Sequence, residues 1–141
     1  MLKSKVENSL NNKLKVIFCI GENKEHKSNN KTFEVLENQI KNVLEEKFNC
    51  KDIIIAYEPI WSIGTGQIPE SSDLLKTTIF IKKVLKNIFK KKSVPAVLYG
   101  GSVDGKNIRQ FKKLNEIDGF LIGGASKSDK NFIDIIKNYY K

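Results

Sequence analysis

The chain has 141 residues and a formal net charge of +9, from 25 lysines and arginines against 16 aspartates and glutamates. This length is enough for one ordinary domain and too short for two. The chain has no apolar run of about 18 residues and its N-terminal segment is polar, so we expect neither a membrane span nor a secretory signal but a soluble intracellular protein.

The positive charge raises the question of nucleic-acid binding, because basic patches attract phosphate backbones. The positive side chains are nearly all lysines: Arg109 is the only arginine, and the lysines are scattered apart from a run at residues 90–92. No nucleic-acid-binding motif accompanies them, so we expect no nucleic-acid partner. Cys19 and Cys50 lack metal-ligand spacing and are expected to be reduced and structural.

The first part of the chain alternates helical and strand patterns. Apolar residues at helical spacing predict a helix over residues 1–13, and the apolar run at 14–20 predicts a strand. A polar loop at 23–32 follows, and apolar periodicity then predicts a helix over 32–48. The continuous apolar run at 53–57 is typical of a parallel strand that is covered on both faces.

The second part repeats this alternation. Broad apolar periodicity predicts a helix over residues 71–89, followed by a short strand at 95–99. A helix at 104–114, a strand at 117–122 and a closing amphipathic helix at 131–140 complete the chain. Four strand–helix units in strict alternation predict an α/β fold with a parallel sheet and right-handed crossovers.

A carboxylate and several small residues follow the predicted strand ends. Glu58 ends the strand at 53–57, and α/β barrels keep their chemistry at the carboxyl ends of their strands. Small residues follow three strands: Gly64 and Gly66; Gly100, Gly101 and Ser102; Gly123, Gly124 and Ser126. Such turns can converge their N–H groups on one phosphate. Glycines can also simply end strands, but three turns on one sheet edge favour a phosphate site.

Four segments resemble one family, triosephosphate isomerase, in the family's order. They are IFCIGE at 17–22, AYEPIWSIGTG at 56–66, YGGSV at 99–103 and DGFLIGGAS at 118–126. The resemblance spans essentially the whole chain, and its second segment is the most specific. The departures are small: Ser62 where alanine is usual, Gln67 where lysine is common and Lys127 where leucine is usual.

The resemblance implies a partial (β/α)8 TIM barrel. A complete barrel needs about 250 residues, and residues 1–141 resemble only its C-terminal half, from the end of the fourth helix through the eighth helix. The family's lysine after strand one and its electrophilic histidine after strand four have no counterpart here. The only histidine, His26, lies in the polar loop and is expected to be solvated.

The resemblance also implies an activity: interconversion of dihydroxyacetone phosphate and glyceraldehyde 3-phosphate through an enediolate, in glycolysis and gluconeogenesis. It assigns Glu58 as the catalytic base. The phosphate is expected to bind the N–H groups of Gly64, Ser102, Gly123 and Gly124. The lid and its supports are expected to be Pro59, Ile60, Trp61, Ser62, Ile63, Thr65, Gly66, Tyr99, Leu121 and Glu22, with Ile63 and Leu121 forming an apolar clamp on Glu58.

The same resemblance implies how the lid moves: Trp61 is expected to lie near Glu22 when the lid is open, and Tyr99 and Ser102 to hold it closed. No metal or cofactor is required, and the substrate is a small triose phosphate. A full-length member is expected to be a homodimer in the cytoplasm, or in an organelle if a targeting segment precedes Met1.

Two classes of function remain open. The first is an isomerase sequence present as a fragment that is inactive or nearly so alone, because it lacks the electrophile and leaves the apolar interior of its sheet and two strand edges exposed. The second is a non-catalytic half barrel that binds phosphates or pairs with a complementary half.

Overall fold

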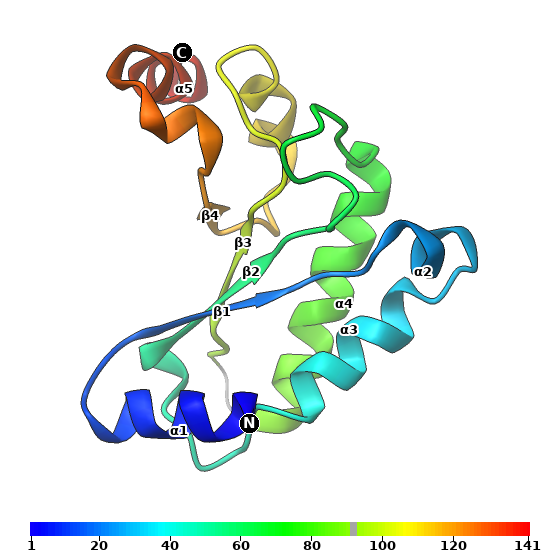
Figure 1. The fold of residues 1–141 in the computed structure, drawn as a ribbon, viewed down its shortest axis with the longest axis vertical. Coiled ribbons are helices and arrows are strands. Elements are labelled where there is room, and N and C mark those ends of the chain that lie inside the picture. Colours follow the sequence, from blue (N-terminus) through cyan, green and yellow to red (C-terminus); the bar gives the residue numbers. More distant parts are fainter. Residues whose placement is uncertain (91–92) are drawn as a thin grey trace.

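The computed structural model describes residues 1–90 and 93–141, which form one parallel sheet with the helices at residues 32–41 and 71–89 on one side of it (Figure 1). The α-helices are α1 (Leu2–Asn11), α2 (Lys24–Ser28), α3 (Thr32–Lys41), α4 (Ser71–Phe89) and α5 (Asp129–Tyr140). The strands are β1 (Val16–Ile20), β2 (Ile53–Tyr57), β3 (Ala96–Tyr99) and β4 (Gly119–Phe120). Short 3₁₀ helices are η1 (Cys50–Asp52), η2 (Ile108–Lys113) and η3 (Gly124–Lys127). The predicted α/β class with parallel strands is confirmed.

The sheet has the order β1-β2-β3-β4, so each strand lies beside the one that precedes it in the sequence. All three pairs are parallel, with Phe18 opposite Ile55 and Ile55 opposite Val97. Parallel neighbours joined by crossovers place all their carboxyl ends on one edge. The loops after the strands therefore gather at that edge.

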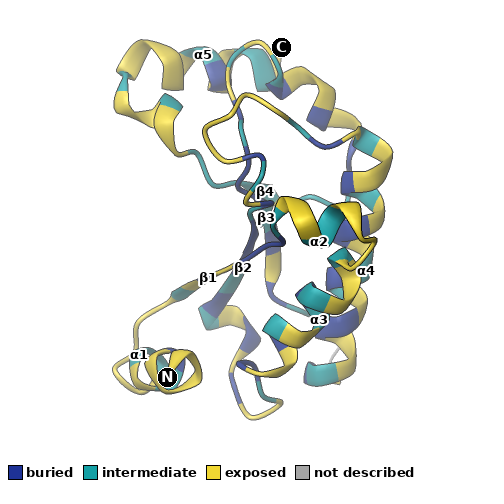
Figure 2. Cartoon of the chain, turned by 45° about the vertical axis from the view of Figure 1, so that its right-hand side comes forward, coloured by how far each residue is buried: buried dark blue, intermediate teal, exposed yellow. Residues whose placement is uncertain are grey.

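The two faces of the sheet differ in burial, because α3 and α4 lie on the same side of it (Figure 2). Successive side chains of a strand point to opposite faces. Phe18 and Ile20 of β1 are buried on the helix side, whereas Ile17 is 48% exposed on the other face, where Cys19 is also exposed. The prediction that β2 is covered on both faces is confirmed only in part: on the face away from the helices Ala56 is 0% exposed, but Ile54 is only half-buried.

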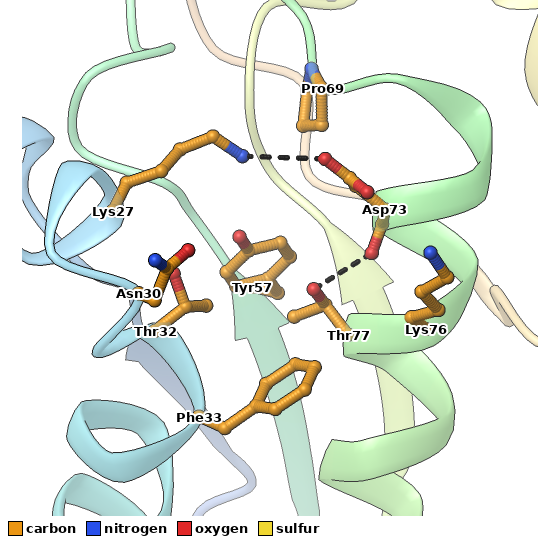
Figure 3. A pocket seen from close by; sticks show the side chains of 9 residues that line it. All are labelled: Lys27, Asn30, Thr32, Phe33, Tyr57, Pro69, Asp73, Lys76 and Thr77. Atoms are coloured by element: carbon orange, nitrogen blue, oxygen red, sulfur yellow. Dashed lines mark hydrogen bonds and ion pairs between the residues drawn. The ribbon is translucent and has the colours of Figure 1, made fainter.

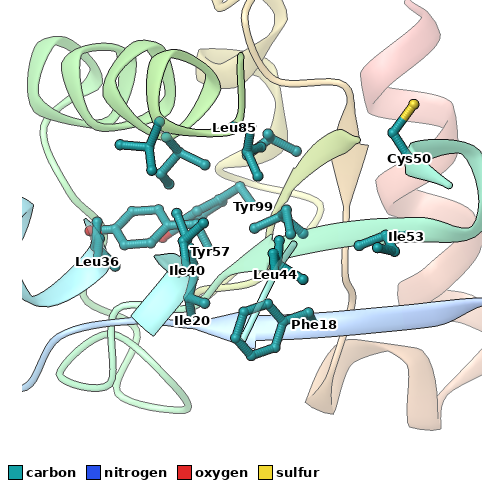
Figure 4. Packing of buried hydrophobic residues seen from close by; sticks show 14 of the residues in the cluster. Phe18, Ile20, Leu36, Ile40, Leu44, Cys50, Ile53, Tyr57, Leu85 and Tyr99 are labelled. Atoms are coloured by element: carbon teal, nitrogen blue, oxygen red, sulfur yellow. The ribbon is translucent and has the colours of Figure 1, made fainter. Parts of the chain in front are cut away.

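The core lies between the sheet and helices α3 and α4 (Figure 4). Leu36 and Ile40 of α3 and Leu85 of α4 are fully buried, and they pack in the same cluster as Ile20 and Ile55. Burying a side chain of this size stabilises a fold by about 1.5–3 kcal/mol. The hydrophobic core therefore lies on the helix-covered side of the sheet and leaves the other face open.

Helix α3 ends at Lys41, seven residues before the end predicted for it at residue 48. Val43 and Leu44 remain 5% and 3% exposed in the turn that follows, and the Leu44 N–H still donates to the Ile40 carbonyl at 2.9 Å. The apolar spacing continued past the helix because these side chains enter the core from irregular chain.

The helix predicted at 104–114 is also wrong in part, because only a 3₁₀ helix, η2, forms there. The Asp104 carboxylate accepts the Lys106 and Asn107 N–H groups at 2.7 and 2.9 Å, a local turn that competes with an α-helix. The strand predicted at 117–122 is reduced to β4. Before β4, the Asp118 side chain accepts the Val97 N–H at 2.7 Å in place of a ladder bond.

The polar loop predicted at 23–32 contains helix α2. The Asn23 side chain accepts the His26 N–H at 2.8 Å and caps this helix. His26 is half-buried there, so the prediction of a solvated loop residue is wrong.

The lysine run at residues 90–92 is described only at Lys90, which pairs with Glu46 at 2.9 Å; Lys91 and Lys92 lie outside the described residues. Within the described ranges, none of the helices combines the length and apolar character needed to cross a bilayer.

Candidate active site

Glu58 is held at the carboxyl end of β2, between the two neighbouring strands. Its N–H donates to the Ile20 carbonyl at 2.8 Å, and the Gly100 N–H donates to the Tyr57 carbonyl at 2.8 Å. The side chain is half-buried. The predicted carboxylate therefore lies at the edge of the sheet where the loops gather.

Two glycines make room for Glu58. A Cβ at Gly100 would lie 2.6 Å from Glu58 Cγ and 3.0 Å from its Oε1, and a Cβ at Gly21 would lie 1.8 Å from the Glu58 carbonyl oxygen. The sequence predicts neither contact: it assigns Gly100 to a phosphate-binding turn, and Gly21 only follows the apolar run at 14–20. Both positions need glycine for Glu58 to occupy its place.

Cys19 is a neighbour of Glu58 that sequence reasoning missed. It lies opposite Ala56, and Ala56 and Glu58 alternate onto the same face of β2. Burial of the thiol, then the hydrogen bond to Glu58 and its negative charge, raise the pKa of Cys19 to about 11, although part of the residue reaches solvent. The period of two in β1 and β2, combined with their register, is the signal that could have found this contact.

The first end of the predicted lid, residues 59–67, is hydrogen-bonded to the loop after β1. Trp61 Nε1 donates to Glu22 Oε1 at 2.8 Å, and the Tyr57 hydroxyl lies 3.2 and 3.1 Å from the two Glu22 oxygens. Glu22 is 0% exposed. Burial and the Glu22 charge raise the pKa of Tyr57 far above its usual value. Lys27 lies 4.7 Å over the Trp61 ring, a contact that was not predicted.

The second end of the lid is tied to the turn after β3. The Gly66 N–H donates to the Ser102 hydroxyl at 3.2 Å, and that hydroxyl donates to the Ser62 carbonyl at 2.6 Å. Tyr99 is 1% exposed, and its hydroxyl lies 3.3 Å from Ser62 Oγ. Tyr99 and Ser102 therefore both contact the lid. The contacts expected of the closed lid and the Trp61–Glu22 hydrogen bond expected of the open lid are both present in this structure.

The tip of the lid and the turn after β4 are open. Gly64 has a φ of +68°, a left-handed conformation that favours glycine, and Ile63 beside it is 48% exposed. A Cβ on Gly64, Gly123 or Gly124 would meet nothing within 4 Å.

Leu121 is half-buried, and its N–H donates to the Tyr99 carbonyl at 3.0 Å. Since Ile63 is also largely in solvent, these two side chains do not enclose Glu58 here. The remaining lid residues include Pro59, which is buried, and Ile60 and Thr65, which are exposed.

A cavity of about 340 Å³ lies behind the lid, on the helix side of the sheet (Figure 3). Its lining comes from α2, α3, β2, α4 and the loops before α3 and α4: Lys27, Asn30, Thr32, Phe33, Tyr57, Pro69, Asp73, Lys76 and Thr77. Lys27 and Asp73 pair across it at 3.7 Å. Because Tyr57 and Glu58 point to opposite sides of β2, this cavity does not contain the carboxylate. Among the described residues, no group of three or more His, Cys, Asp or Glu side chains could hold a metal ion.

A carboxylate and glycine-rich turns at the carboxyl ends of parallel strands define an α/β chain of the TIM-barrel class. The sequence model of the family described as triosephosphate isomerase matches residues 1–139. The chain therefore belongs to the triosephosphate isomerase family, a family of isomerases.

Individual relatives agree. The triosephosphate isomerase of Thermodesulfovibrio yellowstonii is 39% identical over 138 residues, 97% of this chain and 56% of the relative. That of Saccharomyces cerevisiae is 42% identical over 125 residues, 87% and 50% of the two chains. The crystal structure of triosephosphate isomerase from Bartonella henselae has a TM-score of 0.87 at 31% identity and covers 99% of this chain and 56% of that one. The chain spans about half the length of the curated relatives it matches.

Proposed function

We propose that residues 1–141 are the C-terminal half of a triosephosphate isomerase barrel, from the end of the fourth helix through the eighth helix. The order of the strand-end segments supports this placement: IFCIGE, AYEPIWSIGTG, YGGSV and DGFLIGGAS follow β1 to β4 in turn and resemble the family's strands five to eight. The whole barrel would interconvert dihydroxyacetone phosphate and glyceraldehyde 3-phosphate, and family members of full length are expected to be cytoplasmic homodimers.

Glu58 is the base that moves a proton between adjacent carbons of the triose phosphate through an enediolate. The observation that carries this role is the position of its carboxylate, packed against Gly100 at the carboxyl end of β2 and beside the lid. A carboxylate in contact with water is a weak base, because hydration stabilises its charged form. Closure of Ile63 and Leu121 over Glu58 removes water and strengthens the base.

The substrate phosphate binds to backbone N–H groups at the same edge. Gly64, Gly123 and Gly124 have open space around their α-carbons, which leaves room for an anion to approach the backbone closely. Ser102 contributes its N–H from the turn after β3 once that group leaves Ser62 Oγ, which it contacts at 3.4 Å in this structure. Lid closure then keeps water from the enediolate and suppresses loss of its phosphate.

Catalysis requires the other half of the barrel. Loss of a preorganised electrophile typically costs ~10² to 10³ in rate, and this chain has no counterpart of the family's lysine and histidine. We therefore expect the 141-residue chain alone to show no isomerisation above background.

A chimeric barrel tests both the placement and the activity. The first half of the Thermodesulfovibrio yellowstonii relative is fused before Met1, and isomerisation of glyceraldehyde 3-phosphate is measured. We expect activity that Glu58→Gln abolishes. The matched control fuses the second half of the same relative after Lys141, and we expect no activity from it. A folded first chimera without activity, or full activity of the 141-residue chain alone, would overturn the proposal.

The open face of the sheet favours a second candidate, a half barrel that pairs with a separate complementary chain. Ile17, Ile54 and Ala96 lie side by side across three strands on this face and none of them is buried, as expected of an apolar surface that another polypeptide covers. Mixing the two halves as separate chains distinguishes the candidates: activity restored without a covalent link supports the pair, whereas activity that requires fusion supports one longer chain.

A further inference from the structure

Ser62 differs from its neighbours in the lid because it is 0% exposed. The four residues after it, 63–66, are all exposed. A buried hydroxyl is stable only when its hydrogen bonds are satisfied. The surroundings of Ser62 Oγ therefore indicate what holds this part of the lid in place.

The Ser62 hydroxyl has three polar neighbours. Its one proton is donated to the Gln67 carbonyl at 2.5 Å. The Tyr99 hydroxyl at 3.3 Å and the Ser102 N–H at 3.4 Å are then donors to the same oxygen. One donated and two accepted bonds use the full capacity of a hydroxyl group. The side chain thus joins the two ends of the lid to each other and both to the turn after β3.

The turn after β3 is shaped to receive this hydroxyl. A Cβ at Gly101 would lie 2.2 Å from the Tyr99 hydroxyl and 2.8 Å from Ser62 Oγ, so only glycine leaves room for their contact. The Ser102 hydroxyl completes the arrangement by donating to the Ser62 carbonyl at 2.6 Å. Both the side chain and the backbone of Ser62 are therefore bound to this turn.

We propose that the hydrogen bonds of the Ser62 hydroxyl hold the base of the lid against the turn after β3 and set how often the lid leaves this turn. Ser62 is a positioning residue: it touches the lid and its support, not the substrate. The inference rests on the proposed function of residues 59–67 as a lid, but it concerns motion that is measurable without catalysis. When the lid lifts, Ser62 Oγ must give up the Tyr99 and Ser102 bonds together.

Hydrogen exchange on the 141-residue chain tests whether the Ser62 hydroxyl holds the lid in this way. Ser62→Ala removes the donor to Gln67 and the acceptor for Tyr99 and Ser102, so we expect amides of the peptide 60–69 to exchange about 3- to 10-fold faster, the effect of one lost net hydrogen bond. Emission from Trp61, the only tryptophan, should shift as the lid loosens. The matched control is Thr78→Val, which removes a buried hydroxyl that donates to the Leu74 carbonyl within α4, and it should leave the lid unchanged.

A double-mutant cycle separates the contact between the Ser62 and Tyr99 hydroxyls from a general loosening of the lid. If the Tyr99 hydroxyl donates to Ser62 Oγ, Tyr99→Phe should speed lid exchange in the wild-type background and have little further effect in Ser62→Ala. Additive effects, or unchanged exchange at 60–69 in both single variants, would overturn the proposal. Should Ser62→Ala not fold, unchanged lid exchange in Tyr99→Phe alone overturns it. The two proposals can fail separately. If the chimeric barrel is inactive but Ser62→Ala speeds exchange in the lid of the 141-residue chain, the isomerase proposal is refuted and this one is supported.

Discussion

The Glu58 side chain lies directly over the α-carbon of Gly100, where a Cβ would stand 2.6 Å from Glu58 Cγ. Contacts this short do not persist, so Gly100→Ala must move the carboxylate. In the chimeric barrel we expect kcat to fall by about 100-fold, because a shift of about 1 Å at a reacting group can cost that much. KM should change less, since Gly100 is not among the residues proposed to bind the phosphate.

Gly105→Ala is the matched control for this substitution, because its Cβ would meet Asp134 at 3.2 Å, away from Glu58. Steady-state kinetics and circular dichroism of both variants provide the measurement. Equal kcat for Gly100→Ala and the parent would show that Glu58 does not depend on this packing.

Cys19 reports the charge of Glu58. The pKa of its thiol is raised to about 11 by burial, then by the hydrogen bond to Glu58 and its negative charge. Glu58→Gln removes that charge, so the pKa should fall while staying above its usual value because burial persists. At pH 9, each unit of decrease raises the thiolate fraction, and hence the rate of alkylation by iodoacetamide, by roughly tenfold.

The alkylation experiment is carried out in a Cys50→Ser background so that only Cys19 reacts. Glu34→Gln, at an exposed position of α3, is the control for removing a negative charge elsewhere. An unchanged pH profile in Glu58→Gln would mean that the carboxylate does not face the thiol.

The strands and the position of Glu58 could be predicted because they depend on local pattern. The apolar runs at 14–20 and 53–57 predicted β1 and β2, although β1 begins only at Val16. The carboxylate directly after β2 was then placed by chain order alone. The lengths of α3 and β4 could not be predicted, because Val43 and Leu44 are buried from irregular chain and the Asp118 side chain accepts the Val97 N–H just before β4.

The contacts around the candidate site required the tertiary structure. Cys19 meets Glu58 through the register of β1 on β2, and Lys27 meets Trp61 through the position of α2 beside the lid. Neither contact follows from spacing along the chain. For Ser62, the resemblance predicted a place in the lid, but its burial and its three hydroxyl contacts became visible only when Tyr99 and Ser102 were placed around it.

Tyr57 stabilises the buried Glu22 carboxylate, so its hydroxyl contributes to folding as well as packing. Tyr57→Phe removes the group that lies 3.2 and 3.1 Å from the two Glu22 oxygens. Hydrogen bonds to charged groups contribute about 1.5–3 kcal/mol, and we expect a loss of that size in the free energy of unfolding by urea. Tyr140→Phe, at a position 80% exposed, should change it by less than about 0.5 kcal/mol. Equal stability of the two variants would contradict this role.

The open face of the sheet should drive the chain alone to self-associate. Ile17 and Ile79 are each 48% exposed, but Ile17 lies on the open face of β1 and Ile79 on the outer side of α4. Contiguous exposed apolar surface promotes association, whereas single exposed apolar residues are ordinary. Ile17→Lys should therefore lower the sedimentation coefficient at high protein concentration, and Ile79→Lys should leave it unchanged. If both substitutions reduced association equally, the added positive charge would be the cause wherever it is placed, and the open face would not be the surface through which the chains associate.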